Sequence, residues 1–177
     1  MAFNVNSFRT ALVAGGTRPN QFDLIVPFPA GTNNATVDMT MMCHAASLPG
    51  EDVGVIDVAY FGRMIKVPGD RVFPEWTVTI YNDEDFQIRD AFEQWSGFIN
   101  THVANLRAAN YLPWQTYSQN ITVHQYGKVG GIIKTYTMTG AWPSNVSAIQ
   151  TAWDNVNTIE SFDVTFAFQW WNANTTD

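Results

Sequence analysis

The sequence predicts a mainly β protein, in which two packed antiparallel sheets form a β-barrel or sandwich with one flanking α-helix and a long projecting hairpin or loop. Three observations support this fold class. Alternating apolar and polar residues dominate the chain, one long segment has helical spacing, and a stretch broken by glycine and proline lies between alternating segments. With 177 residues, 46% of them hydrophobic, the chain has the size and core material of one globular domain. We therefore expect a single domain over residues 1–177.

Seven segments alternate with a period of two residues, which is typical of strands with one buried face. They cover residues 22–28, 35–45, 53–61, 76–82, 121–129, 132–142 and 161–171. In residues 35–45, alternation places Met39 and Cys43 on one face and Asp38 on the other, which predicts a strand with one apolar side. Gly130 and Gly131 lie between two alternating segments and predict a tight hairpin turn, because glycine readily adopts positive φ angles.

One long segment has the period of an amphipathic helix. Its apolar positions are Ile88, Ala91, Phe92, Trp95, Phe98 and Ile99. Asp83, Glu84 and Asp85 precede them, and acidic side chains favour a helix N-terminus because they accept hydrogen bonds from unpaired N–H groups and complement the helix dipole. The pattern therefore predicts a helix over residues 84–99.

Two other segments are less regular. A short helix is expected over residues 7–13, with Ser7 as its N-cap and Gly15 and Gly16 ending it. Residues 100–118 have little periodicity and are expected to form a loop.

Residues 46–72 predict a long hairpin that projects from the body, because glycine and proline punctuate the segment while its apolar content stays high. A projecting apolar arm is poorly suited to water and should pack on a neighbouring chain. We expect four residues to anchor this contact between subunits: Val55, Ile56, Tyr60 and Phe61.

The chain carries few charges, and they are mostly acidic. Charged residues make up 14% of the chain, against about 25% in a typical soluble domain. Nine Lys and Arg face sixteen Asp and Glu, a formal net charge of −7, which argues against the basic footprint of a DNA-binding protein. So few charges cover a free surface poorly. Either neutral polar residues fill in, since Asn and Thr are abundant, or other protein covers much of the surface, and the two explanations are compatible.

No pattern in the sequence predicts catalysis, a cofactor or a metal site. The three histidines, His44, His102 and His124, are far apart in sequence, and the single cysteine, Cys43, excludes an intramolecular disulfide. Nucleophile elbows and glycine-rich phosphate loops are absent from the sequence. No apolar stretch reaches the length of a membrane span.

Two other functions stay open on composition alone. Seven tryptophans and an acidic balance suit a carbohydrate-binding β-sandwich module, in which aromatic rings stack on sugars. A small hydrolase with a carboxylate pair is a more distant alternative, since sixteen acids always offer some suggestive pair.

Three long segments resemble one known family. They are GTRPNQFDLIV (16–26), AASLPGEDVGVIDVAYFGRMIKVPGDRVFPEWTVTIYNDEDF (45–86) and GAWPSNVSAIQTAWDNVNTIESFDVTFAFQWW (140–171). The most specific pieces are RPNQF, the ASLPG turn, the VPGDR block that runs on to YNDE, the WPSNV turn and the tryptophan-rich C-terminal strand. In order and spacing they resemble the tail tube proteins of contractile-tailed, myovirus-type bacteriophages. The loop at residues 100–119 falls outside the resemblance.

The resemblance implies a structural virion protein rather than an enzyme. It implies hexameric rings that stack into the hollow inner tube of a contractile phage tail and conduct DNA during ejection into the host, without specific DNA binding and without a membrane. The implied partners are other copies of the chain, the tail sheath protein, the tape measure protein, and the baseplate and tail terminator proteins. Assembly would take place in the host cytoplasm.

The implied fold also suggests which residues face the lumen. We expect residues 35–45, 53–67, 120–129 and 132–142 in the inner barrel, with Asp38 and Asp57 as lumen-facing acids. Six copies at −7 each give a ring a formal charge of −42, and a negative lumen would repel phosphate and let DNA slide.

Overall fold

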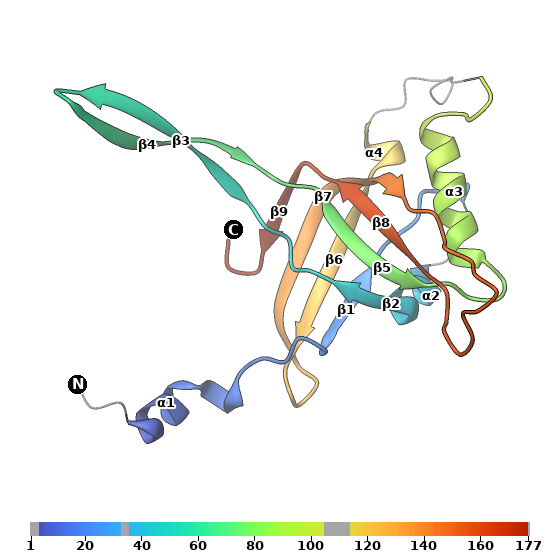
Figure 1. The fold of residues 1–177 in the computed structure, drawn as a ribbon, viewed down its shortest axis with the longest axis horizontal. Helices are drawn as coiled ribbons and strands as arrows, with labels where there is room; N and C mark the ends of the chain where they lie inside the picture. Colours follow the sequence, from blue (N-terminus) through green and yellow to red (C-terminus); the bar gives the residue numbers. More distant parts are fainter. Residues whose placement is uncertain (1–3, 33–35, 105–113, 177) are drawn as a thin grey trace.

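The computed structural model describes residues 4–32, 36–104 and 114–176. In these residues seven strands form one antiparallel sheet that folds into two layers (Figure 1). The first layer contains β1 (Phe22–Ile25), β6 (Gln119–Tyr126), β7 (Ile132–Val146) and β9 (Trp170–Ala173). The second contains β2 (Cys43–Ala46), β5 (Trp76–Tyr81), β8 (Ser161–Ala167) and the end of β7. The prediction of a mainly β fold with packed antiparallel sheets is confirmed, and the two layers are continuous through β7.

β7 passes from one layer to the other at Gly140. Residues before it pair with β6 and β9, whereas Trp142 to Val146 pair with β8. Gly140 has φ +67, and its backbone N–H donates to the Asn120 side-chain oxygen at 3.2 Å. A Cβ at this position would lie 3.1 Å from the Trp114 ring. Glycine is therefore required at this corner both by conformation and by space.

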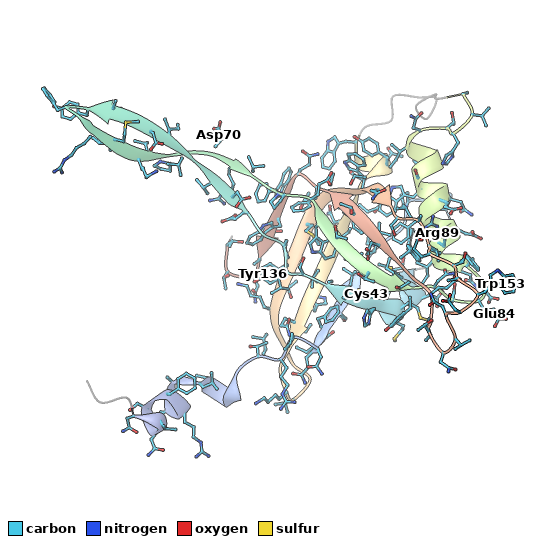
Figure 2. All side chains as sticks on the ribbon, viewed as in Figure 1. Cys43, Asp70, Glu84, Arg89, Tyr136 and Trp153 are labelled. Carbon is cyan, nitrogen blue, oxygen red and sulfur yellow. The ribbon has the colours of Figure 1, made fainter. Side chains whose placement is uncertain are left out.

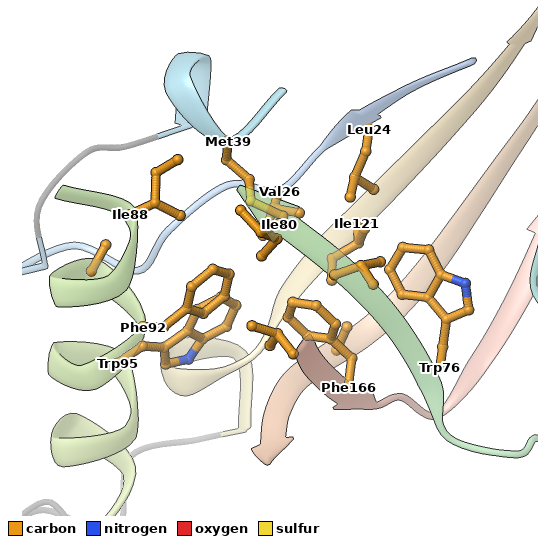
Figure 3. Close-up of a cluster of buried hydrophobic side chains, with 14 of the residues drawn as sticks. Leu24, Val26, Met39, Trp76, Ile80, Ile88, Phe92, Trp95, Ile121 and Phe166 are labelled. Atoms are coloured by element: carbon orange, nitrogen blue, oxygen red, sulfur yellow. The ribbon is translucent and has the colours of Figure 1, made fainter. Parts of the chain in front are cut away.

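The core lies between the two layers (Figure 3). Every second residue of β5, β6 and β8 is buried, as alternation predicts for strands with one polar face. The first layer contributes Leu24, Ile121, Val123 and Met138, and the second contributes Trp76, Val78, Ile80 and Phe166. The two faces form a single hydrophobic cluster.

Helix α3 (Gln87–Ile99) covers one side of this core through four fully buried residues, Ile88, Ala91, Phe92 and Trp95 (Figures 1 and 3). The predicted helix is confirmed, but its predicted start is wrong by three residues. The residue before it, Phe86, has φ +54 and makes no side-chain cap hydrogen bond. This left-handed residue breaks the helix, so Asp83, Glu84 and Asp85 lie in the preceding turn and Asp90 is the acid in the first turn.

The predicted strand at residues 35–45 is wrong. Helix α2 (Thr36–Met42) occupies most of it, and only the short β2 follows. Met39 is fully buried and Met42 is half-buried against the core, which is the i, i+3 spacing of a helix face. Methionine has high helix propensity, and a short alternating run does not by itself distinguish the two periods.

The predicted strand at residues 161–171 is divided into β8 and β9. β8 pairs with β5 and with the end of β7, whereas β9 pairs with the first part of β7. The hairpin loop between β6 and β7 runs over residues 127–131 and is longer than the predicted two-glycine turn, although Gly130 does have φ +83.

The N-terminal segment consists of α1 (Val5–Ala11) and the 3₁₀ turn η1 (Val13–Gly15). The predicted short helix is confirmed, but its N-cap is Asn4, whose side chain accepts a hydrogen bond from the Asn6 N–H at 3.0 Å. In the predicted 100–118 loop, helix α4 (Trp114–Tyr117) is present, and residues 105–113 lie outside the described residues.

A separate two-stranded sheet, formed by β3 (Asp52–Tyr60) and β4 (Arg63–Val72), projects far from the body (Figure 1). The predicted projecting hairpin is confirmed. We call residues 52–72 the arm.

Candidate functional site

The arm is an antiparallel hairpin closed by a two-residue turn. Tyr60 pairs with Arg63, and the turn residues Phe61 and Gly62 have φ angles of +45 and +78. Two consecutive positive φ angles match the right-handed twist of a β-hairpin, so the sequence closes the arm at this point. Side chains stand out on both sides of the ribbon along its length (Figure 2).

The register gives the arm two different faces. Directly opposed residues in an antiparallel pair share a face. The apolar face carries Ile56, Val58, Tyr60, Arg63, Ile65 and Val67. The charged face carries Val55, Asp57, Ala59, Met64, Lys66 and Pro68, with Asp57 and Lys66 forming an ion pair at 3.4 Å.

The arm does not bury its apolar side chains within the subunit. Every residue of β3 is exposed, including Ile56 at 54% and Tyr60 at 61%, and Phe61 at the tip is 91% exposed. A soluble monomer rarely exposes so continuous an apolar surface, and such surfaces mark contacts with other molecules. The apolar face of the arm is therefore a candidate protein interface.

The structure separates the predicted anchors into three environments. Ile56 and Tyr60 lie on the apolar face, whereas Val55 lies on the charged face. Phe61 occupies the turn and packs edge-on against Tyr60, with ring centroids 4.7 Å apart.

The two predicted lumen acids lie in unrelated places. Asp57 is in the arm, where Lys66 compensates its charge. Asp38 is exposed in the first turn of α2, and therefore does not lie on the polar face of a strand as alternation predicts. The structure does not bring these two carboxylates together.

Residues 47–50 lead into the arm, and we call them its root. Contacts of the root, which alternation does not predict, attach the arm to the body. The indole N–H of Trp76 in β5 donates to the Ser47 carbonyl oxygen at 2.7 Å, and that of Trp171 in β9 donates to the Gly50 carbonyl oxygen at 3.0 Å. Pro49, between them, is buried. These partners are distant in sequence, so no local pattern could have identified them.

The outward face of the first layer is the second candidate surface. The residues that alternate with the buried positions of β6 and β7 include Thr122, His124, Tyr126, Thr135, Thr137 and Thr139. None of them is Lys or Arg. Tyr126 donates to the Asp23 carboxylate at 2.6 Å, and His124 Nδ1 lies 3.0 Å from the Thr135 hydroxyl. This hydrogen bond to the carboxylate raises the pKa of Tyr126, because it favours the protonated hydroxyl.

The N-terminal segment is a third exposed apolar element, and its exposure was not predicted. Val5 is 78% exposed, Phe8 69% and Val13 83%, and α1 has no buried residue. The i, i+3 spacing of Val5 and Phe8 could have identified this stripe.

The described part of the chain assembles no metal site, and two acids that line one cavity accept structural hydrogen bonds. The described residues contain no group of three or more His, Cys, Asp or Glu side chains able to hold a metal ion. A cavity of about 530 Å³ lies between residues 147–160 and β8, with Glu160 and Asp163 in its lining. Both carboxylates accept structural hydrogen bonds, from Asn82 at 3.3 Å and Thr79 at 2.7 Å.

Comparison with known proteins identifies the family. The profile of the family described as phage tail tube protein matches residues 17–174. The tail tube protein gp19 of Enterobacteria phage T4 is 33% identical over 158 residues, which are 87% of this chain and 90% of the relative. The chain belongs to the phage tail tube protein family. The tail tube protein of Serratia phage KSP90 is 28% identical over 150 residues, 82% of this chain and 83% of the relative.

Solved structures share the fold of this tail tube protein. The tube terminating cap of the anti-feeding prophage superposes with a TM-score of 0.62 at 16% identity, covering 90% of this chain and 91% of the other. A chain of the sheath-tube complex of an extracellular contractile injection system, PVC, in its extended state, superposes with a TM-score of 0.58 at 14% identity, covering 98% and 99%.

Family membership decides between the functions that composition left open. The chain is a phage tail tube protein, a structural component of the virion tail, and the carbohydrate-binding alternative has no support. Among the described residues, no helix is long and apolar enough to cross a membrane.

Proposed function

We propose that this tail tube protein assembles into hexameric rings, that the rings stack into the hollow inner tube of a contractile tail, and that the arm of each subunit covers a neighbouring copy. The whole chain, residues 1–177, acts as one tail tube domain. The observation that carries the proposal is the exposed apolar face of the arm, defined above. Obligate interfaces are rich in apolar area of this kind, and assembly would remove it from water.

The accessible surface supports the same conclusion. The isolated chain exposes 12469 Å², whereas a compact monomer of 19.8 kDa exposes about 8,600 Å². A subunit with so much excess surface gains stability when neighbours cover its projections. Head-to-tail contacts of one chain with its copies close into rings or extend as filaments, and a stacked tube uses both.

We further propose that the outward face of β6 and β7 lines the lumen through which DNA passes during ejection. Its threonine hydroxyls and the absence of Lys and Arg among those outward positions support this assignment, because phosphate binding depends on clustered cations. DNA would slide past this surface without being held.

The proposed partners follow from the assemblies in which proteins of this fold occur. Structures that share this fold come from a sheath-tube complex, a sheath/tube terminator and a baseplate. By analogy, the tube would contact a sheath protein along its outside, and baseplate and terminator proteins at its ends. A tape measure protein would lie inside, and assembly would take place in the host cytoplasm.

Asp38 and Asp57 remain proposed lumen acids, tested one at a time. Asp57→Lys places two lysines opposite each other in the arm, and Asp38→Lys reverses an exposed charge on α2. If either carboxylate faces the lumen, its lysine variant should form normal tails that eject DNA more slowly. Unchanged ejection by assembled variant tails would refute the assignment for that residue.

Ile65 and Met64 provide a matched test of the arm, because they are neighbours in β4 that point to opposite faces. Ile65→Asp places a carboxylate on the apolar face and should abolish tube formation, since an unpaired charge in an interface is costly. Met64→Asp adds the same charge to the charged face and should leave tubes intact. The measurement is electron microscopy of purified protein, with circular dichroism to confirm folding.

Equal behaviour of the two variants would contradict the assignment of the apolar face. A chain lacking residues 51–66 should stay folded and fail to form rings or tubes, and intact tubes from that deletion would contradict any role for the arm in assembly.

A further inference from the structure

We infer that Trp76 and Trp171 are positioning residues whose indole N–H groups fix the direction in which the arm leaves the body. This inference rests on the proposed function of the arm as the contact between copies. It adds that the angle between arm and body, and therefore the geometry of the assembly, is set by two hydrogen bonds outside the interface.

The two indoles hold opposite ends of one short segment. Trp76 binds the carbonyl oxygen of Ser47, and Trp171 binds that of Gly50, just before β3 begins. Trp76 comes from the second layer of the body and Trp171 from the first. The two hydrogen bonds therefore fix this segment to both layers at once, and Pro49 is buried between the two bonded carbonyls.

Both tryptophan side chains are themselves held rigidly. Trp76 is 3% exposed, and its ring packs against Phe166 with centroids 5.8 Å apart. The Trp171 ring packs edge-on against Tyr136 at 5.5 Å. An indole has a single N–H donor, so a fixed ring gives its hydrogen bond one direction. Each carbonyl of the arm root is therefore held at a defined place.

The returning strand is attached more loosely. Phe73, after the end of β4, packs against Phe168 with centroids 6.0 Å apart, and Arg71 forms an ion pair with Glu51 at 3.2 Å. The ring contact is less directional than a hydrogen bond. The ion pair is about half-exposed and therefore weak, and it joins Arg71 to the outgoing side of the arm and not to the body. The indole bonds thus provide most of the directional restraint.

The arm contains an irregularity just beyond this root. The register shifts between Val53 and Val55, and Gly54 lies so close to the opposite strand that a Cβ would come within 3.2 Å of the Asp70 carbonyl oxygen. Such a bulge re-aims a strand. From there to the tip, β3 and β4 are hydrogen-bonded only to each other in the sheet topology, so the root decides where the tip points.

Single-molecule energy transfer on the full-length chain tests this inference, because it works at concentrations where copies do not meet. Donor and acceptor dyes are attached to Met64→Cys in the arm and Gln94→Cys on α3, in a Cys43→Ser background. In one variant the Trp171 indole is replaced by the isosteric benzothiophene, which lacks the N–H. Two further variants, Trp76→Phe and Trp171→Phe, remove the same donors by ordinary substitution. Trp153→Phe is the control, since Trp153 is 105% exposed and lies far from the arm (Figure 2).

We expect a narrow arm-to-body distance distribution in the parent and in Trp153→Phe, and a broadened or shifted one in the three root variants. Loss of one hydrogen bond changes the population of other orientations by about 2- to 10-fold, so the concentration needed for tube assembly should rise by a similar factor. Melting temperatures near that of Trp153→Phe would separate this effect from general destabilisation.

An unchanged distance distribution in the benzothiophene variant and in both phenylalanine variants would overturn the inference, whatever happens to assembly. A broadened distribution with unchanged assembly would instead leave the positioning role intact and refute the proposed role of the arm as the contact between copies.

Discussion

Gly140 is the residue on which the two-layer arrangement depends most directly. Its φ of +67 lets β7 pass from one layer to the other, and the nearby Trp114 ring leaves little space for a side chain. A side chain here would meet backbone strain and steric overlap together.

Gly140→Ala should therefore lower the free energy of unfolding by about 2–4 kcal/mol, combining a left-handed backbone cost with overpacking. Gly130→Ala is the matched control, because Gly130 has φ +83 but no atom within 4 Å of its added Cβ. That variant should lose only about 1 kcal/mol. Urea denaturation measures both losses, and equal losses would show that neither Gln169 nor Trp114 restricts the corner.

Cys43 offers a pH-dependent test at the residue scale. Burial raises the pKa of its thiol from 9.0 to about 11, because desolvation disfavours the thiolate. At pH 8 the thiolate fraction in the folded protein is then about 100-fold lower than in an unfolded chain. Iodoacetamide should alkylate Cys43 correspondingly more slowly in buffer than in urea, and similar rates would contradict the buried environment.

The same raised pKa has a consequence for stability. The folded state retains the thiol proton at a pH where the unfolded state loses it, so this contribution to stability is complete below pH 9 and is lost as the pH rises toward 11. The raised pKa of Tyr126 acts in the same direction, since its hydroxyl stays protonated to donate to Asp23.

Helix α3 is the element that completes the core. Phe92 is fully buried, and its ring lies within 5.1 Å of Phe28 and 5.9 Å of Phe166, centroid to centroid. Phe92→Ala should reduce the free energy of unfolding by about 3–5 kcal/mol, through lost burial and the cavity left behind. Phe98→Ala is the control, because Phe98 is only half-buried on the same helix, and it should reduce the free energy of unfolding by less. Equal losses in urea denaturation would mean that α3 does not seal the core through Phe92.

Elements with one buried and one polar face were predictable from the sequence. β5 and β8 alternate cleanly because the core covers one side and threonine hydroxyls meet on the other, as in the Thr77 and Thr165 pair at 3.0 Å. The arm was predictable for a different reason, because glycine and proline break up a segment whose apolar residues are too many for a free surface.

The elements that were mispredicted depend on tertiary contacts. Residues 36–42 alternate as a strand would, yet Met39 meets the core from a helix. The start of α3 is set by the left-handed Phe86, which composition does not reveal. The root contacts of the arm join residues 29 and 121 positions apart, a separation at which no local period exists.

At the scale of the whole molecule, the shortage of charge and the excess of surface have one explanation. A chain with only 14% charged residues exposes 12469 Å², and its arm and N-terminal segment carry many of its exposed large apolar side chains. In a tube, neighbouring copies would cover these projections. The few charged residues would then be enough to keep the smaller remaining surface hydrated.

The central claim is that this tail tube protein forms a hollow tube in which the apolar face of the arm is buried against a neighbouring copy. Cryo-electron microscopy of the concentrated full-length protein tests it most directly. We expect stacked six-subunit rings around an open channel, with Ile56, Val58 and Ile65 enclosed by an adjacent subunit. Monomers at every concentration, or tubes in which this face of the arm remains in solvent, would contradict it.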